Sequence, residues 1–222
     1  MIKQAAAAIV AAYNEEPTIG QIVRTLVDSH LFRDVIVISD GSTDATAEKA
    51  VAAGATLVHQ FPWKHGKGAA MMHGVAHTDA PILFFLDADL KGLGQKHLES
   101  LLMPVLKGEC DMSVGLRDRG RFLTALTRFL PLISGERVLN RRIFEDIPDK
   151  YLKGFMVETA LNYYCRIHRL RICRREMPGL NMRKKMQKVG FLKGLKEYIV
   201  MGIQMIRASL IIRYGKFRGD FS

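Results

Sequence analysis

The chain has 222 residues, of which 48% are hydrophobic and 25% are charged, and its formal net charge is +11. This length suits one large domain, and the composition is that of a globular protein rather than a fibrous or low-complexity chain. The three cysteines, Cys110, Cys165 and Cys173, form neither a metal-binding spacing nor an even set for disulfides, so we expect a reduced, cytoplasmic environment. The apolar run near the N-terminus is too short for a signal peptide.

The charge is unevenly distributed along the chain. Residues 1–116 contain 9 Lys and Arg against 13 Asp and Glu, whereas residues 117–222 contain 24 against 9. A basic half of this kind indicates an anionic partner: a phosphate, a nucleic acid or an anionic membrane surface. A basic face that is merely solvated is the plain alternative.

Strands and helices alternate through the first ninety residues. Apolar runs predict buried strands at residues 6–12, 35–39, 56–59 and 82–86. Apolar stripes between them predict helices that end near residues 30, 54 and 77, the first with Thr18 as N-cap and Gln21 completing a capping box. This alternation predicts an α/β fold, a Rossmann-like, mostly parallel sheet with helices on both faces.

The second half of the chain continues this pattern less regularly. We expect a helix at 95–107, a strand at 112–116, helices at 121–130 and 154–167, and a basic strand at 170–178.

A basic amphipathic helix is predicted at the C-terminus, over residues 188–213. Its longest uncharged stretch, residues 198–206, is shorter than the roughly 20 residues of a membrane span. The apolar stripe packs on the sheet domain or lies on a membrane surface, and the pattern leaves both open.

Distinctive polar residues follow each of the four predicted strands. They are residues 13–16, residues 40–44, Lys67, and the pair Asp87 and Asp89. Because ligands of open α/β sheets gather at the carboxyl ends of the strands, we expect one shared crevice. Two carboxylates one residue apart repel each other unless a cation lies beside them, so a hard divalent ion bound to a pyrophosphate explains Asp87 and Asp89 economically. A solvated pair of acids at a strand end is the plain alternative.

Taken in this order, residues 11–19, 37–46, 65–70 and 85–90 resemble glycosyltransferase family 2, whose members have the A-type nucleotide-sugar fold. The resemblance covers residues 5–117 well and the later chain more loosely. Two branches look closest, the glucosyl-3-phosphoglycerate synthases and the polyprenyl- or dolichyl-phosphate sugar synthases. The first branch has a metal-binding His in a late basic loop, and residues 178–183 here contain none.

The resemblance implies roles for individual residues. The donor nucleotide-sugar would be bound by Tyr13, Asn14, Glu15, Asp40, Lys67, Asp87 and Ala88. Asp87 and Asp89 would hold Mg²⁺ or Mn²⁺, with Asp89 as the catalytic ligand.

Four further residues are candidates for the acceptor side. Arg117 follows a predicted strand end, and Arg suits bidentate phosphate contacts, so we favour Arg117 and Arg137 for binding the acceptor or the diphosphate. Glu158 either stabilises its helix through the helix dipole or serves as a carboxylate of the acceptor site. If the acceptor is a hydroxyl, Glu158 or Glu136 is the candidate base.

These observations predict a metal-dependent glycosyltransferase. It would move a hexose from a UDP- or GDP-sugar to an anionic acceptor, either a polyprenyl phosphate or a small phosphorylated acid such as 3-phosphoglycerate. Residues 1–117 would form the donor and metal half and residues 118–180 the acceptor half of one domain, followed by a basic helical segment at 181–222. We expect no nucleic-acid partner, and a homodimer and a peripheral position on the inner face of the membrane stay open.

Two other classes of function compete with this one. A sugar-nucleotidyltransferase would share the sheet and the metal, but its Gly-rich phosphate loop is absent after the first strand. A non-catalytic basic protein that binds membrane or nucleic acid would explain the positive charge but not the clustered acids.

A histidine pair lies outside this scheme. His73 and His77 are four residues apart on a predicted helix, as in many zinc sites. No Cys or carboxylate nearby completes a ligand set, so we interpret the two as a surface pair.

Overall fold

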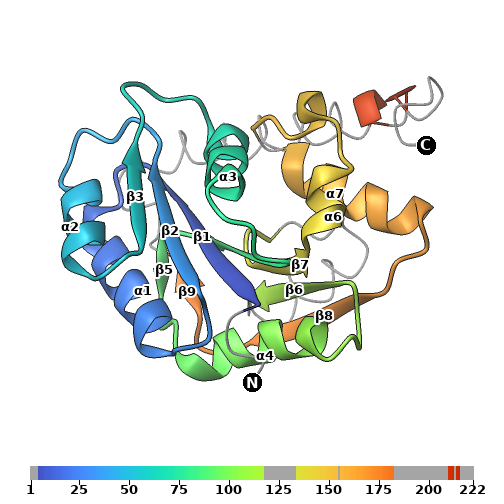
Figure 1. Cartoon of the computed structure of the whole chain (residues 1–222), viewed down its shortest axis with the longest axis horizontal. Coiled ribbons are helices and arrows are strands. Elements are labelled where there is room, and N and C mark those ends of the chain that lie inside the picture. Colours follow the sequence, from blue (N-terminus) through green and yellow to red (C-terminus); the bar gives the residue numbers. More distant parts are fainter. Residues whose placement is uncertain (1–4, 118–133, 155, 183–209, 213, 216–222) are drawn as a thin grey trace, which may run out of the picture.

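The computed structural model describes residues 5–117, 134–154, 156–182, 210–212 and 214–215. A seven-stranded sheet forms its centre, in the order β3-β2-β1-β4-β7-β6-β8 (Figure 1). These strands are β1 (Ala6–Ala12), β2 (Asp34–Ser39), β3 (Leu57–Gln60), β4 (Ile82–Asp87), β6 (Met112–Arg117), β7 (Arg137–Asn140) and β8 (Ile172–Met177). A second, two-stranded sheet pairs β5 (Leu90–Lys91) with β9 (Asn181–Met182).

Helices connect and cover the strands. They are α1 (Glu16–Asp28), α2 (Thr46–Ala52), α3 (Lys67–Ala76), α4 (Gln95–Leu106), α6 (Arg141–Glu145), α7 (Met156–Ile167) and the 3₁₀ turn η1 (Asp149–Tyr151). Every described helix is too short or too polar to cross a membrane.

The sheet is mostly parallel, as predicted. Strands β3, β2, β1 and β4 run in one direction, and β6 and β8 are parallel to each other. Only β7 runs against both of its neighbours, with Arg137 opposite Phe85 of β4 and Val114 of β6. The sequence did not reveal β7, because a four-residue strand that starts with an arginine and ends with an asparagine gives no apolar run.

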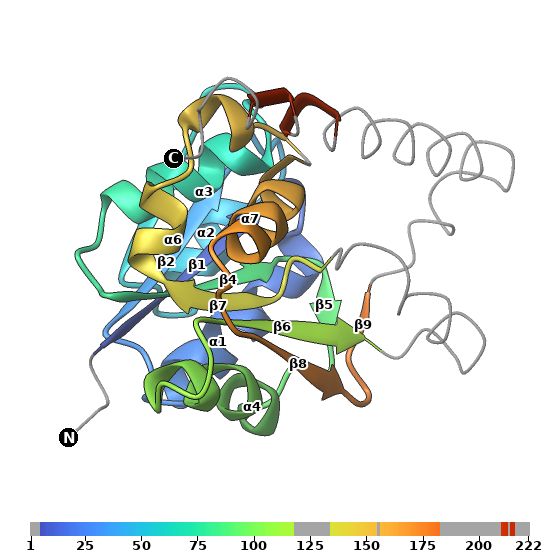
Figure 2. The same ribbon diagram turned by 90° about the vertical axis from the view of Figure 1, so that its right-hand side faces the viewer.

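The two faces of the sheet carry two separate cores. Alternate residues of β4 show this, since Phe84 and Leu86 face the core under α1, α2 and α4, while Leu83 and Phe85 face the core under α3, α6 and α7. Figure 2 shows α4 on one side of the strands and α6 and α7 on the other. Burial on both faces explains why β4 is a continuous apolar run rather than an alternating one.

The start of α1 corrects one expectation. The helix begins at Glu16 with Pro17 in its first turn, and Thr18 lies inside it rather than at the N-cap. Proline fits the first turn because the amide hydrogens there have no helical partner. The hydroxyl of Thr18 instead donates to the carbonyl oxygen of Ala88, 2.7 Å away, and so fixes α1 to the turn after β4.

Several expectations fall outside the described residues. These are the helix at 121–130 and almost all of the helix at 188–213. The division at residue 180 stays a prediction, although the described fold continues through β9, which pairs Leu90 with Met182.

Candidate functional site

The turns after β1 and β2 interlock at the carboxyl ends of the strands. Asn14 has a positive φ of 54°, and its amide N–H donates to the hydroxyl of Ser42 at 3.1 Å. The side-chain oxygen of Asn14 accepts from the amide of Thr43 at 2.8 Å, and the amide of Glu15 donates to the hydroxyl of Thr46 at 2.9 Å. These bonds hold together the segments that lead into α1 and α2. The sequence did not single out two of the groups involved, the hydroxyls of Ser42 and Thr46.

Asp40 holds the loop between β3 and α3. Its buried carboxylate accepts the amide hydrogens of His65 at 2.6 Å and Gly66 at 2.9 Å. The neighbouring Gly41 has a φ of 74°, and a Cβ there would overlap the backbone of Trp63 and Lys64. The loop thus packs directly on the end of β2, which only glycine at position 41 permits.

Tyr13 presents its ring at the rim of this loop. The side chain is 40% exposed, and the Lys64 ammonium lies 3.8 Å from the ring centroid, a cation–π contact. An exposed aromatic face with a cation beside it is suited to a nucleobase and its phosphates.

Lys67, Asp87 and Glu158 form an ion cluster from three elements. The Lys67 ammonium, at the start of α3, lies 2.6 Å from Oδ1 of Asp87 at the end of β4 and 2.8 Å from Oε1 of Glu158 in α7. Burial alone would lower the pKa of Lys67, but the negative charges of Asp87 and Glu158 outweigh it and raise that pKa. The ammonium therefore stays charged and holds two carboxylates together that would otherwise repel each other.

Arg137 opens β7, and Glu136 directly precedes it. Both side chains are buried, and the Arg137 guanidinium donates to the carbonyl of Ser134 and to the side-chain oxygen of Asn162, each at 2.8 Å. Burial lowers the pKa of Arg137, and the charges of Glu158 and its acidic neighbours oppose that shift. These contacts make Arg137 a positioning group for β7 and α7, and its predicted contact with an acceptor stays a prediction.

Asp89 is nearly buried in the turn after β4. A Cβ on Gly135 would overlap the carboxylate of Asp87, so a larger residue there would have to displace that carboxylate. Within the described residues, the end of β4 carries the carboxylates of Asp87 and Asp89, and Asp87 shares the Lys67 ammonium with Glu158. Oxygen ligands of this kind fit a hard divalent cation such as Mg²⁺ or Mn²⁺.

The structure brings the predicted residues to one edge of the sheet. The parallel pairing of β3, β2, β1 and β4 puts the residues after each strand at that edge. Residues 13–15, Asp40, Lys67 and residues 87–89 all lie there. Arg117 ends β6, and its side chain lies outside the described part of the chain.

A hollow of about 660 Å³ lies elsewhere, at the opposite ends of the strands. Its wall includes Pro81 before β4, Asp111 before β6 and Asn140 at the end of the reversed β7. None of the predicted site residues lines it, so this hollow is separate from the acidic cluster.

Comparisons with known proteins bear on the cluster at the carboxyl ends. The model of the family described as glycosyl transferase family 2 matches residues 7–177, more than half of the chain. Among solved structures, the chain is similar to glucosyl-3-phosphoglycerate synthase from Mycobacterium tuberculosis in complex with phosphoglyceric acid. The TM-score is 0.76 and the identity 25%, over 94% of this chain and 79% of that chain.

A second complex of that mycobacterial enzyme contains Mn²⁺, UDP and glucosyl-3-phosphoglycerate. It is similar to this chain with a TM-score of 0.76 and 26% identity, over the same shares of the two chains. A curated relative, the 4,4'-diaponeurosporenoate glycosyltransferase of Staphylococcus aureus (strain USA300), is 37% identical over 99 residues. These residues are 42% of this chain but only 26% of that relative, so the match spans about a quarter of the relative's length.

Proposed function

Since the chain belongs to glycosyl transferase family 2, we propose that it moves a hexose from a UDP-sugar to a small phosphorylated acceptor that carries a hydroxyl group. The predicted family and the A-type fold are confirmed by the family match and by the fold of the mycobacterial enzyme. The choice of donor and acceptor is our proposal. It is supported by the UDP and the phosphorylated product that the similar mycobacterial enzyme binds.

One observation carries this proposal. Lys67, Asp87 and Glu158 come from α3, β4 and α7, and they meet within hydrogen-bonding distance. Asp89 follows Asp87 by two residues at the end of the same strand. The three charges are largely withdrawn from solvent, so each loses part of its hydration. A lysine whose pKa is shifted by such partners at a ligand-binding edge of the sheet is a candidate functional group.

We assign the donor nucleoside to the edge formed by Tyr13, Glu15 and Asp40. The Tyr13 ring offers an exposed face for the base. Carboxylates suit the N–H groups of a base and the hydroxyls of a ribose. Asp40 already accepts two amide hydrogens, and a carboxylate has about four lone-pair sites, so it keeps capacity for a donor group.

We assign the divalent cation, Mg²⁺ or Mn²⁺, to Asp89 with Asp87. When bound, such an ion neutralises the charge that develops on the diphosphate as the glycosidic bond opens. Lys67 holds the Asp87 carboxylate in place, and the Thr18 hydroxyl fixes the Ala88 carbonyl between the two acids.

Glu158 is our candidate for the residue that contacts the acceptor. In the transfer, the bond between the sugar carbon and the diphosphate oxygen breaks, and a bond to the acceptor oxygen forms. A hydroxyl acceptor must lose its proton, and a carboxylate held at the cluster is suited to accept it. The basic second half of the chain would attract the phosphate of the acceptor.

The test is a panel of UDP-, GDP-, ADP- and dTDP-sugars in thermal-shift experiments, with Mn²⁺ or with a chelator. A ligand that binds only the folded state raises the melting temperature, so we expect the UDP-sugars to raise it with Mn²⁺ and not without. The sugar-nucleotidyltransferase alternative predicts instead that nucleoside triphosphate and sugar phosphate release pyrophosphate.

Turnover is then measured with labelled UDP-glucose and 3-phosphoglycerate. Formation of a labelled phosphorylated glycoside supports the proposal. Transfer to a lipid extract alone would favour polyprenyl phosphate as the acceptor, and no metal-dependent binding of any nucleotide would refute the enzyme assignment.

A further inference from the structure

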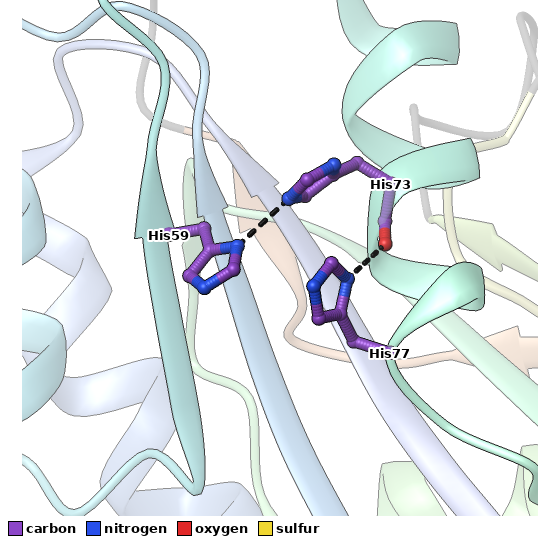
Figure 3. A group of neighbouring side chains, drawn as sticks. All are labelled: His59, His73 and His77. Carbon is purple, nitrogen blue, oxygen red and sulfur yellow. Dashed lines mark hydrogen bonds between the residues drawn. The ribbon is translucent and has the colours of Figure 1, made fainter.

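Three histidines from two elements gather on the edge of the sheet next to α3 (Figure 3). His59 belongs to the edge strand β3, His73 to α3, and His77 ends that helix. Each offers a ring nitrogen, and these nitrogens all lie within 4.8 Å of one another. Within the described residues, this is the group of three or more His, Cys, Asp or Glu side chains whose ligand atoms gather this closely. The pair His73 and His77 found in the sequence therefore has a third member, His59. The sequence did not reveal it, because it lies 14 residues before His73 and across a loop.

The hydrogen bonds of the cluster prepare its rings for a ligand. Nδ1 of His59 and Nε2 of His73 are 2.8 Å apart, so the two rings point their nitrogens at each other. Nδ1 of His77 donates to the backbone carbonyl of His73 at 2.8 Å. A neutral imidazole that donates through Nδ1 has its lone pair on Nε2, and such a carbonyl partner is the usual support of a metal-bound histidine.

The packing of the three rings keeps them close without a cation. The ring centroids of His73 and His77 are 4.5 Å apart, and those of His59 and His77 are 4.6 Å apart. Burial lowers the pKa of His73, and the charges of His77 and His59 lower it further. Neutral imidazole is the form that binds metal ions, and burial favours that form of His73.

Zn²⁺ binding requires only a small change in the distances between the ring nitrogens. Zn²⁺ binds imidazole nitrogen at about 2.0–2.1 Å, so two nitrogens on one tetrahedral ion lie about 3.3 Å apart. The pair at 2.8 Å must open by about half an ångström, and His77 must approach, which its exposed position allows.

We propose that His59, His73 and His77 bind one transition-metal ion of the Zn²⁺ class, with water completing the coordination at the solvent-exposed side. Imidazole selects Zn²⁺, Ni²⁺, Cu²⁺ or Co²⁺, whereas Mg²⁺ prefers oxygen ligands. The site is thereby distinct from the acidic cluster, which offers carboxylates and suits Mg²⁺ or Mn²⁺.

A bound ion would link β3 to α3. These elements flank the loop whose amides at His65 and Gly66 bind Asp40. An ion with one ligand on β3 and two on the C-terminal half of α3 ties together the two elements that the loop connects. Bound metal is therefore expected to raise the stability of the folded chain and to protect the loop from proteolysis.

The experiment measures Zn²⁺ binding to the full chain by isothermal titration calorimetry, with Mg²⁺ in large excess to fill the acidic cluster. We expect one equivalent of Zn²⁺ to bind and the melting temperature to rise. Co²⁺ in its place is expected to give the visible absorption bands of a nitrogen-ligated, tetrahedral ion. His77→Gln and His59→Gln are expected to weaken binding at least about tenfold, since even residues that only support a ligand are worth 10- to 100-fold.

The matched control is His168→Gln, which removes another exposed histidine from a helix end outside the cluster. It should bind Zn²⁺ as tightly as the wild type. Because His77 is exposed, His77→Gln should fold normally, which circular dichroism checks. Wild-type protein that binds no Zn²⁺ in excess Mg²⁺, or variants of His59 and His77 that bind as tightly as the wild type, would overturn the proposal.

Discussion

At the scale of single residues, the site depends on charges that are held together by Lys67. The carboxylates Asp87 and Asp89 could be found in the sequence, because two acids directly after an apolar strand are hard to explain without a cation. The partnership of Lys67 with Glu158 could not be found, because 91 residues separate them and no pattern links them. The burial of Arg137 was also hidden, since an arginine in a sequence reads as a surface charge.

Replacing Lys67 by methionine tests this cluster. Lys67→Met leaves Asp87 and Glu158 facing each other without a cation. We expect it to lower the free energy of unfolding by about 2–4 kcal/mol, less than for a fully buried ion pair because Lys67 and Asp87 are partly exposed. The measurement is urea denaturation. Because the pKa of Lys67 is raised, its stabilising effect is fully present below the ordinary lysine value and is lost only above it, so the difference should be equal at pH 7 and pH 9.

A surface pair provides the control for Lys67. Lys49 lies 3.0 Å from Glu16, but both side chains are well exposed. Lys49→Met is expected to change the free energy of unfolding by less than about 1 kcal/mol. If Lys67→Met and Lys49→Met lower the free energy of unfolding by the same small amount, the Lys67 cluster is an ordinary surface contact rather than a strained functional arrangement.

At the scale of elements, the parallel part of the sheet could be predicted and the reversed strand could not. The runs at β1, β2 and β4 are apolar throughout because helices cover both of their faces. β7 depends on tertiary contacts for its place between β4 and β6, and its sequence carries little strand signal. The start of α1 was misjudged because Thr18 matched a capping pattern, while Pro17 and the bond to Ala88 determined the actual start.

Two helical glycines allow a paired prediction about element packing. A Cβ on Gly68, in the first turn of α3, would overlap the carbonyl of Leu152, so Gly68→Ala must push α3 away from the backbone after η1. We expect a loss of about 1–3 kcal/mol, the usual effect of overpacking. A Cβ on Gly20 in α1 would lie 3.9 Å from the carbonyl oxygen of Lys49, an ordinary contact, so Gly20→Ala should gain about 0.5–1 kcal/mol from better helix propensity.

Thermal or urea denaturation of both variants decides this point. We expect Gly68→Ala to lower the stability and Gly20→Ala to raise it. The Gly68 variant should also lose affinity for the donor, because Lys67 directly precedes Gly68. Equal stabilisation by the two alanines would mean that α3 does not approach Leu152 as closely as described here.

At the scale of the whole molecule, the sequence indicated an α/β domain with an acidic ligand edge and a basic second half. The domain and its edge are present in the structure. The contact of the C-terminal segment with a membrane, the homodimer and the cytoplasmic location stay predictions, because residues 183–209 lie outside the described part of the chain. Sequence periodicity also could not join His59 to His73 and His77, since β3 and α3 meet only in the folded domain.

The integrity of both cores can be followed through the cysteines. Burial raises the pKa of Cys165 to about 12, and burial together with the neighbouring Cys173 raises that of Cys110 to about 12. At pH 8 such thiols are about 10⁻⁴ ionised, against about a quarter for an ordinary cysteine. We expect iodoacetamide to alkylate Cys173 first in native protein and all three residues in urea, as measured by mass spectrometry. Rapid labelling of Cys165 without urea would contradict the core described under α7.

The most direct measurement is calorimetric titration of UDP into the wild type and the Asp89→Asn variant, with and without Mn²⁺, with Asp28→Asn on the exposed end of α1 as control. We expect metal-dependent UDP binding by the wild type and by the Asp28 variant. We expect an affinity at least about tenfold lower for Asp89→Asn, since the loss of a metal ligand exceeds the loss of a supporting group. Equal, metal-independent UDP binding by all three proteins would contradict the claim that the carboxyl ends of the strands form one metal-dependent donor site.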